Sequence, residues 1–402
     1  MKKLKIALYT STFPPKLGGI ATSNYNLYHL LKTHYDIKLF VYNDTINNNK
    51  NVIYSKTPRF VTCFIQWLAS IYLKKFDKND QFKTCKTIIR FGVKIFFLNK
   101  SLKQFNPDII LVSDNDIPAY FLKKTSKAKL IWLAHNNYQR FQNQVLCPTI
   151  SPIDNEVACS MERNAVKKAD AIISPSRYMV GVCKETLNLN IPMHVVNNII
   201  LKDVINLLSK EDLYTILNIK SDYPLIYIPS AGSKIKGRRY VYEIVRQLTK
   251  HAKNKIGFYL SGPLPSELKF ELSLIKNAHI YSPGHIEWEE NISNIKSCTI
   301  CISPNIIENY SNALLEAQTV QIPVVAFDTG GNKEIVLNNK TGFIVPHLDI
   351  DQLISKSKLI IDESDIYTKF KDNCISSINT IANQEVILAN YKSIFQKVLN
   401  EH

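Results

Sequence analysis

The sequence contains no long hydrophobic run. No stretch of about 18 or more apolar residues, the length that a membrane-spanning helix requires, occurs in the chain. The run "KIALY" near the start is far shorter than the core of a secretory signal peptide. We therefore expect a cytoplasmic protein that is neither exported by that route nor embedded in a membrane.

Cysteine is sparse and follows no pattern. The eight cysteines are scattered, and only Cys298 and Cys301 have the two-residue spacing typical of zinc ligands. That pair lies in the apolar run "CTICISP", and no second pair completes a tetrahedral site. We expect plain buried thiols in a reducing compartment and no metal site.

The dinucleotide-binding pattern G-x-G-x-x-G does not follow the first strand-like run, which argues against a nicotinamide enzyme. The composition is that of a globular protein: 45% of the residues are hydrophobic and 10% are aromatic, too many for a disordered chain. A chain of 402 residues is long enough for two domains with full cores.

Acidic residues are few in the first half of the chain. Residues 1–200 hold 28 Lys and Arg against 12 Asp and Glu, whereas residues 201–402 hold 22 of each kind, within a net charge of +16. Residues 59–103 carry ten basic and two acidic groups, with Phe, Trp, Ile and Leu between them. This segment is either a pair of core helices with solvated lysines or a surface that binds an anionic membrane. Nucleic acid is a third option, but no recognisable nucleic-acid motif accompanies the charge, and we name no such partner.

Strand-like runs alternate with helical patterns along the whole chain, which indicates an α/β fold with mostly parallel sheets. In the first half, a strand-like run, a glycine turn and a helix over 22–34 are followed by further strand-like runs. These lie at 36–42, 108–113, 129–135, 170–176 and 193–198.

A second block with the same plan begins near Tyr223. A strand over 224–232 leads through a glycine-bounded turn to a helix over 238–250 with apolar residues spaced by three and four. Further strands are expected at 256–262, 278–284, 299–304, 323–328 and 342–346.

The pattern predicts two Rossmann-like, doubly wound domains, residues 1–197 and residues 198–380. Ligands bind at the carboxyl ends of the strands in such sheets, so two facing domains would enclose a cleft. A last helix, within 381–402, would pack back on the first domain.

Two glutamates, Glu308 and Glu316, stand eight positions apart in "ENYSNALLEA", at the expected start of a helix over 311–320. Asn309 or Ser311 is a suitable N-cap. Eight residues of helix rise about 12 Å, close to the reach from a sugar across a diphosphate to a ribose. Because carboxylates accept hydrogen bonds strongly from hydroxyl pairs, we expect Glu308 to hold sugar hydroxyls and Glu316 a ribose diol.

Backbone amides at the start of this helix would face the phosphates, helped by the helix dipole. They are the amides of Tyr310, Ser311, Asn312 and Ala313. The plainer alternative is an ordinary first-turn glutamate followed by a solvent-facing one.

Two glycine-containing loops in the second half fit the same ligand. The loop "AGSKIKGRR" places Lys234, Lys236 and Arg238 on a tight turn, where they would neutralise a leaving diphosphate. Gly330 and Gly331 follow an expected strand and let backbone amides approach a ligand closely. A solvated basic loop and a simple turn are the alternatives.

The first half offers two more candidates. In "PPKLGG", Gly18 and Gly19 lead into a helix N-terminus, which also suits a phosphate. In "WLAHNNY", His135 stands at a strand end, where it could meet a sugar or acceptor hydroxyl, although a lone histidine is more often structural.

In chain order the motifs are the glycine-pair loop, the strand-end histidine, the basic KG loop, the E-x7-E helix and GG-x-x-E-I-V. In this order they resemble those of family-4 (group 1) glycosyltransferases, which have the GT-B fold. The resemblance covers nearly the whole chain, and residues 303–346 are its most specific part. It implies a nucleoside-diphosphate sugar as donor (a UDP- or GDP-sugar), retention of the anomeric configuration, no other cofactor and no required metal.

The resemblance also assigns residues. It implies that Glu308, His135 and Lys236 are catalytic, at the donor sugar, the reacting sugar and the diphosphate. It places Glu316 at the ribose. It also implies that residues 1–197 bind the acceptor and that residues 198–380 bind the nucleotide-sugar donor. Further donor-binding positions are Gly18, Gly19, Lys234, Arg238, His285, Ile286, Asn309, Tyr310, Ser311, Asn312, Ala313, Gly330 and Gly331; His285 and Ile286 belong to "GHIEW", which would face the nucleobase.

The sequence departs from the family pattern ahead of the basic loop. Ser233 or Lys234 stands where the family usually has arginine, and we expect Lys234 to take over that phosphate contact. The expected function is sugar transfer to a glycan or lipid-linked acceptor in lipopolysaccharide, O-antigen or capsule biosynthesis, peripherally on the inner face of the cell membrane. A sugar-nucleotide epimerase and a non-catalytic sugar-nucleotide-binding subunit are the alternatives.

Overall fold

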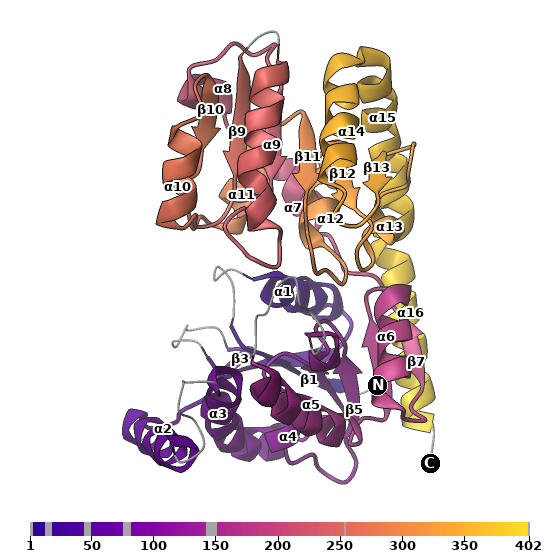
Figure 1. Ribbon diagram of the computed structural model, residues 1–402. Coiled ribbons are helices and arrows are strands. Elements are labelled where there is room, and N and C mark those ends of the chain that lie inside the picture. The colour runs from indigo at the N-terminus through magenta and orange to yellow at the C-terminus, as the bar shows by residue number, and fades with distance from the viewer. Residues whose placement is uncertain are drawn as a thin grey trace. The chain divides into compact units, whose positions relative to one another are not determined.

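The computed structural model describes residues 3–12, 18–43, 50–74, 82–141, 151–252 and 255–400. The chain divides into two compact units (Figure 1). Unit 1 comprises Met1–Ile199 with Gln384–His402, and unit 2 comprises Ile200–Asn383. Each unit is built on its own sheet, and every strand pairing in both sheets is parallel.

Unit 1 contains a seven-stranded sheet in the order β3-β2-β1-β4-β5-β6-β7. Its strands are β1 (Lys5–Thr10), β2 (Asp36–Val41), β3 (Val52–Tyr54), β4 (Ile109–Ser113), β5 (Lys129–Leu133), β6 (Ala171–Ser174) and β7 (Met193–Val195). All of them except the short β3 fall within runs that the sequence predicts as strands.

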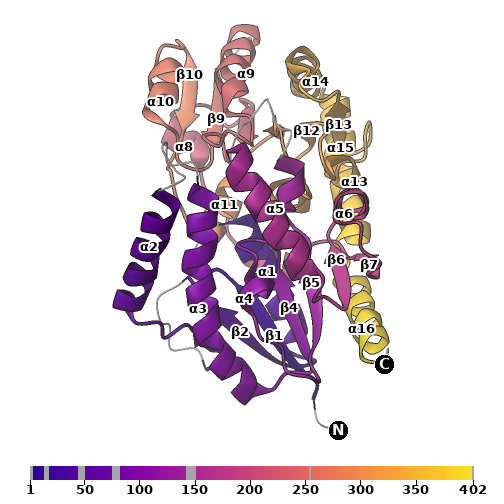
Figure 2. The same cartoon turned by 60° about the horizontal axis from the view of Figure 1, so that its bottom comes forward.

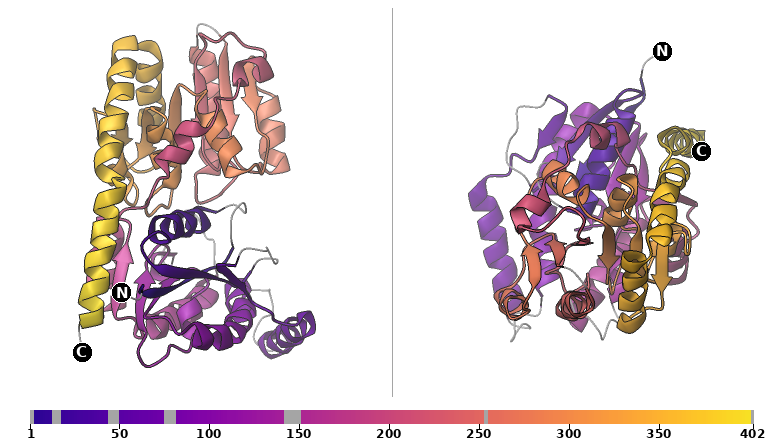
Figure 3. Two further views of the ribbon diagram at one scale, coloured as in Figure 1. Left: turned by 180° about the vertical axis from the view of Figure 1, so that it is seen from behind. Right: turned by 90° about the horizontal axis from the view of Figure 1, so that it is seen from above.

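Helices cover both faces of this sheet. Seen from behind, α1 (Gly19–Leu31) lies on one face, and α3 (Lys83–Phe105), α4 (Pro118–Phe121) and α5 (Pro152–Val166) lie on the other (Figure 3). The remaining helices of unit 1 are α2 (Arg59–Lys74), the 3-10 turn η1 (Tyr138–Phe141), α6 (Arg177–Leu187) and α16 (Gln384–Asn400).

The last helix, α16, packs within unit 1, although 184 residues of unit 2 precede it in the chain. Its Ile387, Tyr391 and Phe395 are buried, and the Phe395 ring lies 5.6 Å from the ring of Tyr35. The chain therefore crosses between the units twice, at residues 199–200 and 383–384.

Unit 2 contains a six-stranded sheet in the order β10-β9-β8-β11-β12-β13. Its strands are β8 (Leu225–Ile228), β9 (Ile256–Leu260), β10 (Ala278–Tyr281), β11 (Ile300–Ser303), β12 (Val324–Phe327) and β13 (Gly342–Val345). Successive residues of a strand enter different cores: Ile226 and Ile228 belong to one apolar cluster, and Leu225 and Tyr227 to another. A sheet that is buried on both faces needs such continuous apolar strands.

The helices of unit 2 supply the outer layers. They are α7 (Lys202–Leu207), α8 (Leu213–Leu217), α9 (Arg238–His251), α10 (Ser266–Ser273), α11 (Trp288–Ile295), α12 (Asn312–Thr319), α13 (Asn332–Ile335), α14 (Ile350–Asp362) and α15 (Ser364–Ile381). Helix α9 illustrates how such a helix packs against the sheet. One of its faces carries apolar residues that are all buried: Val241, Ile244, Val245 and Leu248. Fully burying each such side chain stabilises the fold by about 1.5–3 kcal/mol.

Strand order fixes where a ligand can bind in each sheet. In unit 2, β8 lies between β9 and β11, so the chain winds outward in opposite directions from this point. The helices that follow β8 and β11, α9 and α12, therefore pack on opposite faces of the sheet, and ligands of doubly wound sheets bind at such a switch point. In unit 1 the corresponding strands are β1 and β4.

Candidate functional site

The loops after β8 and β11 touch each other at the switch point of unit 2. The amides of Ile306 and Ile307 both donate to the carbonyl oxygen of Ile235, at 3.0 and 3.1 Å. These bonds hold the basic loop, residues 231–237, against the loop of residues 304–311. The structure thus brings together two segments that the sequence separates by about seventy residues.

Lys236 and Glu308 form an ion pair across these loops, with 2.6 Å between Lys236 Nζ and Glu308 Oε2. The side chain of Glu308 is only 9% exposed. Asn305 Nδ2 donates to the same oxygen at 2.7 Å, and the amide of Asn309 donates to Glu308 Oε1 at 2.9 Å. Both oxygens of Glu308 are therefore held, and its orientation is fixed.

Two glycines let the surrounding backbone approach the Glu308 loop. Gly237 and Gly330 have φ angles of +83° and +59°, which L side chains rarely adopt. A Cβ atom on Gly237 would collide with the carbonyl oxygen of Pro304, and one on Gly330 with that of Glu308. Gly331 donates its amide to the Asn309 carbonyl at 2.6 Å, so the loop is clamped from both sides.

Helix α12 begins at Asn312, and this corrects the expectation that eight helical residues separate the two glutamates. Glu308 lies in the loop before the helix. Ser311 occupies the N-cap position, but its side chain makes no capping hydrogen bond. Asn312 and Ala313 form the first helical positions, where backbone amides point out of the helix end.

Glu316 is buried on α12 and receives a hydrogen bond from Trp288 Nε1 at 2.9 Å. Burial raises the pKa of Glu316 to about 7, and the bond from Trp288 partly opposes this rise. Trp288 is the last residue of "GHIEW" and the first of α11. The segment predicted to face a nucleobase therefore contacts the glutamate predicted to hold a ribose.

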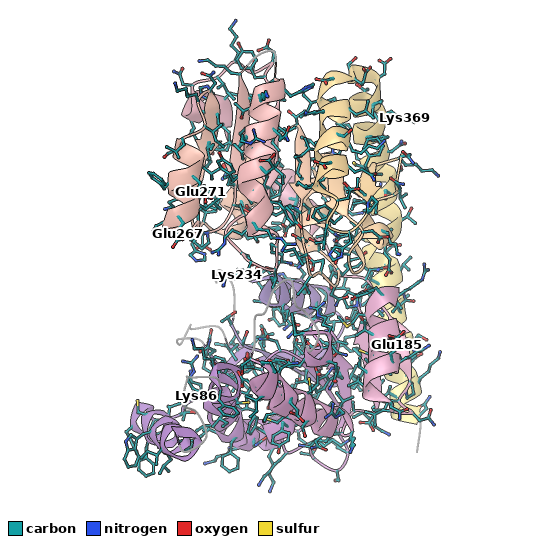
Figure 4. All side chains as sticks on the ribbon, in the orientation of Figure 1. Lys86, Glu185, Lys234, Glu267, Glu271 and Lys369 are labelled. Carbon is teal, nitrogen blue, oxygen red and sulfur yellow. The ribbon has the colours of Figure 1, made fainter. Side chains whose placement is uncertain are left out.

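The other predicted residues of unit 2 lie on the surrounding loops. Lys234 is exposed on the basic loop (Figure 4), and Arg238 is half-buried at the first position of α9. His285 is exposed and Ile286 half-buried in the connection from β10 to α11. Asn309, Tyr310 and Ser311 are buried in the loop before α12.

In unit 1 the first helix begins at Gly19, three residues earlier than the sequence predicts. Gly18 precedes it with a φ of +146° and, like Gly19, is exposed, so this helix start is accessible. The first four residues of the predicted "PPKLGG" loop lie outside the described residues.

His135 lies directly beyond β5 and is half-buried. Burial lowers the pKa of His135 to about 4, so its imidazole is neutral near pH 7. A neutral imidazole can donate from one ring nitrogen and accept at the other, which suits contacts with sugar hydroxyls.

The basic segment 59–103 forms α2 and α3, which lie side by side at the edge of unit 1 (Figure 2). Helix α2 exposes a row of large apolar side chains, hereafter the α2 stripe. The stripe consists of Phe60, Phe64, Trp67, Leu68 and Ile71. On α3, Lys83, Lys100 and Lys103 are exposed, and Lys86 (Figure 4) is half-buried. Among the described residues, no helix combines the length and apolarity needed to cross a membrane.

No three His, Cys, Asp or Glu side chains within the described parts of the chain are grouped so that they could hold a metal ion. Cys298 and Cys301 are buried, and burial raises the pKa of both thiols. They pack in the apolar cluster that also contains Leu314 and Leu315.

The sequence analysis does not predict the roles of several residues of the site. Asn305 donates a hydrogen bond to Glu308, and Trp288 donates one to Glu316. Gly237 leaves space for the backbone of the Glu308 loop. For Gly237 a signal was available, because it closes a tight turn and glycine is the residue that most readily adopts a positive φ. For Asn305 and Trp288, only the three-dimensional contact reveals the role.

One protein-family model matches part of the chain. Residues 209–376, nearly all of unit 2, match the family described as "Glycosyl transferases group 1". The matched region contains Lys236, Glu308 and Glu316. The first half of the chain lies outside this match.

Curated relatives match over short stretches. A capsular polysaccharide biosynthesis glycosyltransferase, CapM of Staphylococcus aureus, is 23% identical over 130 residues, 32% of this chain and 34% of that protein. The UDP-Gal:alpha-D-GlcNAc-diphosphoundecaprenol alpha-1,3-galactosyltransferase of Escherichia coli is 30% identical over 122 residues, 29% and 30% of the two chains. The matches thus span about a third of each relative's length.

Solved structures share the fold over the full chain. Sucrose-phosphate synthase from Thermosynechococcus elongatus superposes with a TM-score of 0.78 at 15% identity and 100% coverage of both chains. HepE from Anabaena, solved in complex with UDP-glucose, superposes with a TM-score of 0.70 at 13% identity and covers 98% of this chain and 100% of its own. The prediction of a two-domain, Rossmann-like GT-B fold is confirmed.

Proposed function

We propose that the protein is a retaining glycosyltransferase that moves a sugar from a nucleoside-diphosphate sugar to a glycan or lipid-linked acceptor. The observation that carries this proposal is the Lys236–Glu308 pair, held on two loops at the switch point of unit 2. A cation and a fixed carboxylate side by side match the two parts of a sugar diphosphate. The cation suits the phosphates, and the carboxylate suits the sugar hydroxyls.

In the proposed complex the donor lies along the ends of β8 and β11. Glu308 accepts hydrogen bonds from the sugar hydroxyls, and Glu316 accepts them from the ribose diol. Lys236, Lys234 and Arg238 face the diphosphate together with the amides at the start of α12. His285 and Ile286, next to the Trp288 that holds Glu316, contact the nucleobase.

Transfer proceeds through an oxocarbenium-like state. The bond between the anomeric carbon and the diphosphate oxygen breaks, and its electron pair leaves with the diphosphate, stabilised by Lys236 and helix amides. The acceptor hydroxyl attacks the same face, and a donor phosphate oxygen takes its proton. In this scheme Glu308 positions the sugar and is not a covalent nucleophile, and the cationic side chains make a divalent metal unnecessary.

The acceptor is inferred from the relatives. One functions in capsular polysaccharide biosynthesis, and another adds galactose to a sugar carried on diphosphoundecaprenol, a membrane lipid. We propose that this protein acts in cell-surface polysaccharide assembly, at the inner face of the cell membrane where such lipid carriers are loaded.

Activity on a panel of UDP- and GDP-sugars, with and without lipid-linked acceptors, tests the proposal, after thermal-shift screening has chosen the donors. Sugar transfer with retained configuration, dependent on acceptor, is expected. Donor epimerisation without acceptor would instead favour the epimerase. Tight nucleotide binding with no turnover on any acceptor would favour a non-catalytic binding subunit, and the proposed activity would be wrong in both cases.

The α2 stripe supports attachment to an anionic membrane surface. Phe60 is 74% exposed and Trp67 is 56% exposed, so both can enter the lipid interface without rearrangement of the core. Positions 60, 64, 67, 68 and 71 share one face of a helix. Lysines on the adjacent α3 add about 1 kcal/mol each near anionic lipid.

Vesicle flotation tests this attachment with a matched pair of variants. Phe64→Ser/Trp67→Ser should lose binding to phosphatidylglycerol vesicles, because it removes the centre of the stripe. Phe270→Ser/Leu274→Ser, which removes two exposed apolar residues of unit 2, one in the last turn of α10 and one directly after it, should bind like the wild type. Neutralising Lys83 and Lys86 should weaken binding and its salt dependence.

Two results would refute membrane attachment. One is a wild-type protein that shows no preference for anionic over phosphatidylcholine vesicles. The other is a preference that survives both the stripe variant and neutralisation of the lysines. The sequence also singles out Lys74 and Lys75 for neutralisation; Lys74 ends α2 and Lys75 lies outside the described residues.

A further inference from the structure

Two carboxylates that take no part in the proposed chemistry are fully buried in unit 1. Asp114, directly after β4, is 0% exposed, and Glu162, on α5, is 1% exposed. Burying an ionised carboxylate away from water is costly unless its oxygens are hydrogen-bonded. The partners of these two acids therefore indicate what they do.

Four consecutive backbone amides converge on the pair. Asp114 Oδ2 accepts from the amides of Asn136 at 2.5 Å and Asn137 at 3.0 Å, and the amide of His135 also donates to Asp114. Glu162 Oε2 accepts from the amide of Tyr138 at 2.9 Å. Amides of a loop that leaves a strand would ordinarily be solvated, but here all four are bound by buried acids.

The backbone conformation of the loop is specific to this arrangement. Asn137 has a φ of +57°, in the left-handed region. A residue of that kind turns neighbouring amides toward one point and forms an anion-binding nest. The anion in this nest is the protein's own carboxylate, Asp114, so the loop after β5 is pinned to the end of β4.

Burial raises the pKa of both acids, that of Asp114 to about 6, and repulsion from Asp114 further raises the pKa of Glu162. Arg140, which follows the loop, opposes the rise in both carboxyls. A buried acid pair of this kind is weak evidence for a gain in stability, because desolvation offsets its attractions. Its specific effect is on the conformation of the loop that carries His135.

We propose that Asp114 and Glu162 are positioning residues that fix His135 for the reaction. This inference rests on the proposed transferase function, in which His135 contacts the reacting sugar. Misplacing a contact by about 1 Å can lower a rate by about a hundredfold, so a pinned loop matters most for turnover.

A matched control lies on the same helix. Asp154 of α5 is also 1% exposed, and it accepts two backbone amides, from Thr84 at 2.7 Å and Cys85 at 2.8 Å. Those amides begin α3 and do not belong to the His135 loop. Asp154→Leu therefore removes a buried, amide-binding carboxylate without touching that loop.

The test compares Glu162→Leu, Glu162→Gln and Asp154→Leu. Glu162→Leu should lower kcat about tenfold or more with the donor KM nearly unchanged. Glu162→Gln keeps an oxygen acceptor for Tyr138 and should restore most of the rate. Asp154→Leu should melt at a lower temperature, as Glu162→Leu does, but keep its kcat.

A double-mutant cycle separates positioning from general damage. In a His135→Ala background, Glu162→Leu should cause no further loss of kcat, because residues that act through one another are not additive. A further loss as large as in the wild type, or an equal loss of kcat in Asp154→Leu, would overturn the proposal.

Histidine ¹⁵N NMR tests the inference without any activity. The His135 ring signals, assigned with His135→Ala, should shift or broaden in Glu162→Leu and Asp114→Asn but not in Asp154→Leu. Unchanged signals in both acid variants would overturn the positioning role even in an active enzyme. If the wild-type protein shows no sugar transfer, the proposed function is wrong. The NMR comparison would still test whether Asp114 and Glu162 position His135.

Discussion

Lys236 Nζ lies 2.6 Å from Glu308 Oε2, although the two residues stand 72 positions apart in the chain. Each lies on a loop that leaves a central strand of the unit 2 sheet, Lys236 after β8 and Glu308 after β11. An ammonium group has three N–H donors, so Lys236 can hold Glu308 and a diphosphate oxygen at once. This relationship is the basis of the proposed donor site.

Replacing Glu308 with Gln should lower kcat about a hundredfold or more, because an amide binds sugar hydroxyls less strongly than a fixed carboxylate does. Steady-state kinetics with the best donor measure this. The fold should remain, as near-wild-type circular dichroism would show. Glu271→Gln, at an exposed position of α10, is the control and should keep full activity. Near-normal turnover of Glu308→Gln would remove the role that we assign to this residue.

Gly237→Ala should abolish nucleotide binding. The new Cβ would collide with the Pro304 carbonyl oxygen at a φ of +83°, so the Glu308 loop must move. Gly181→Ala, on α6, meets nothing within 4 Å and should be neutral or more stable by about 0.5–1 kcal/mol. Thermal melts with and without nucleoside diphosphate check both variants. If nucleoside diphosphate raises the melting temperature of Gly237→Ala as much as that of the wild type, the close packing of Gly237 against the Glu308 loop is not needed for binding.

Glu316 should make the protein less stable as the pH rises from about 4.5 to 7. Its pKa is about 7 in the folded protein against an ordinary 4.5, so between these values the folded state holds a proton that the unfolded state lacks. The resulting loss, about 3 kcal/mol, is absent below pH 4.5 and complete above pH 7.

Urea denaturation between pH 4.5 and 8 measures this effect. Glu316→Gln should lose less stability over that range than the wild type and should be the more stable protein at pH 8, by about 1–3 kcal/mol. It should also bind the donor weakly, since an ionised partner of the ribose diol is gone. If the free energy of unfolding falls equally with pH in the two proteins, folding does not raise the pKa of Glu316.

Transfer should not depend on a divalent metal. In our account Lys236, Lys234 and the amides at the start of α12 supply the positive charge at the diphosphate, so a chelator should leave kcat within about twofold. The measurement is the initial rate of chelated enzyme with and without added Mg²⁺ or Mn²⁺. Complete inactivation by the chelator, reversed by metal, would contradict this part of the mechanism.

Much of the fold follows from local pattern in the sequence. Continuous apolar runs such as 299–304 predict buried parallel strands, and the spacing of Val241, Ile244 and Val245 predicts α9. The three-residue strand β3 carries too short a signal to recognise. The helix expected over 311–320 matches α12 to within one residue, but the helical rise assumed between Glu308 and Glu316 does not hold, because Glu308 lies in the loop before α12.

The site was harder to predict than the fold. Glycine pairs and the two glutamates are visible locally, but contacts such as Lys236–Glu308 depend on strand order, which no single segment encodes. The same holds for Asp114 and Glu162, which accept amides of one loop although they lie on different elements, at the end of β4 and on α5. Likewise, periodicity reveals the apolar face of α2 but not whether the protein covers it.

Calorimetric titration of UDP and GDP into the wild type and Lys236→Gln tests the central claim most directly. We predict one site per chain for at least one of these diphosphates, weakened about a hundredfold, or 2.7 kcal/mol, in the variant. The matching nucleoside should bind both proteins alike. Failure of both diphosphates to bind, or equal affinity in the two proteins, would contradict a donor site at the Lys236–Glu308 pair.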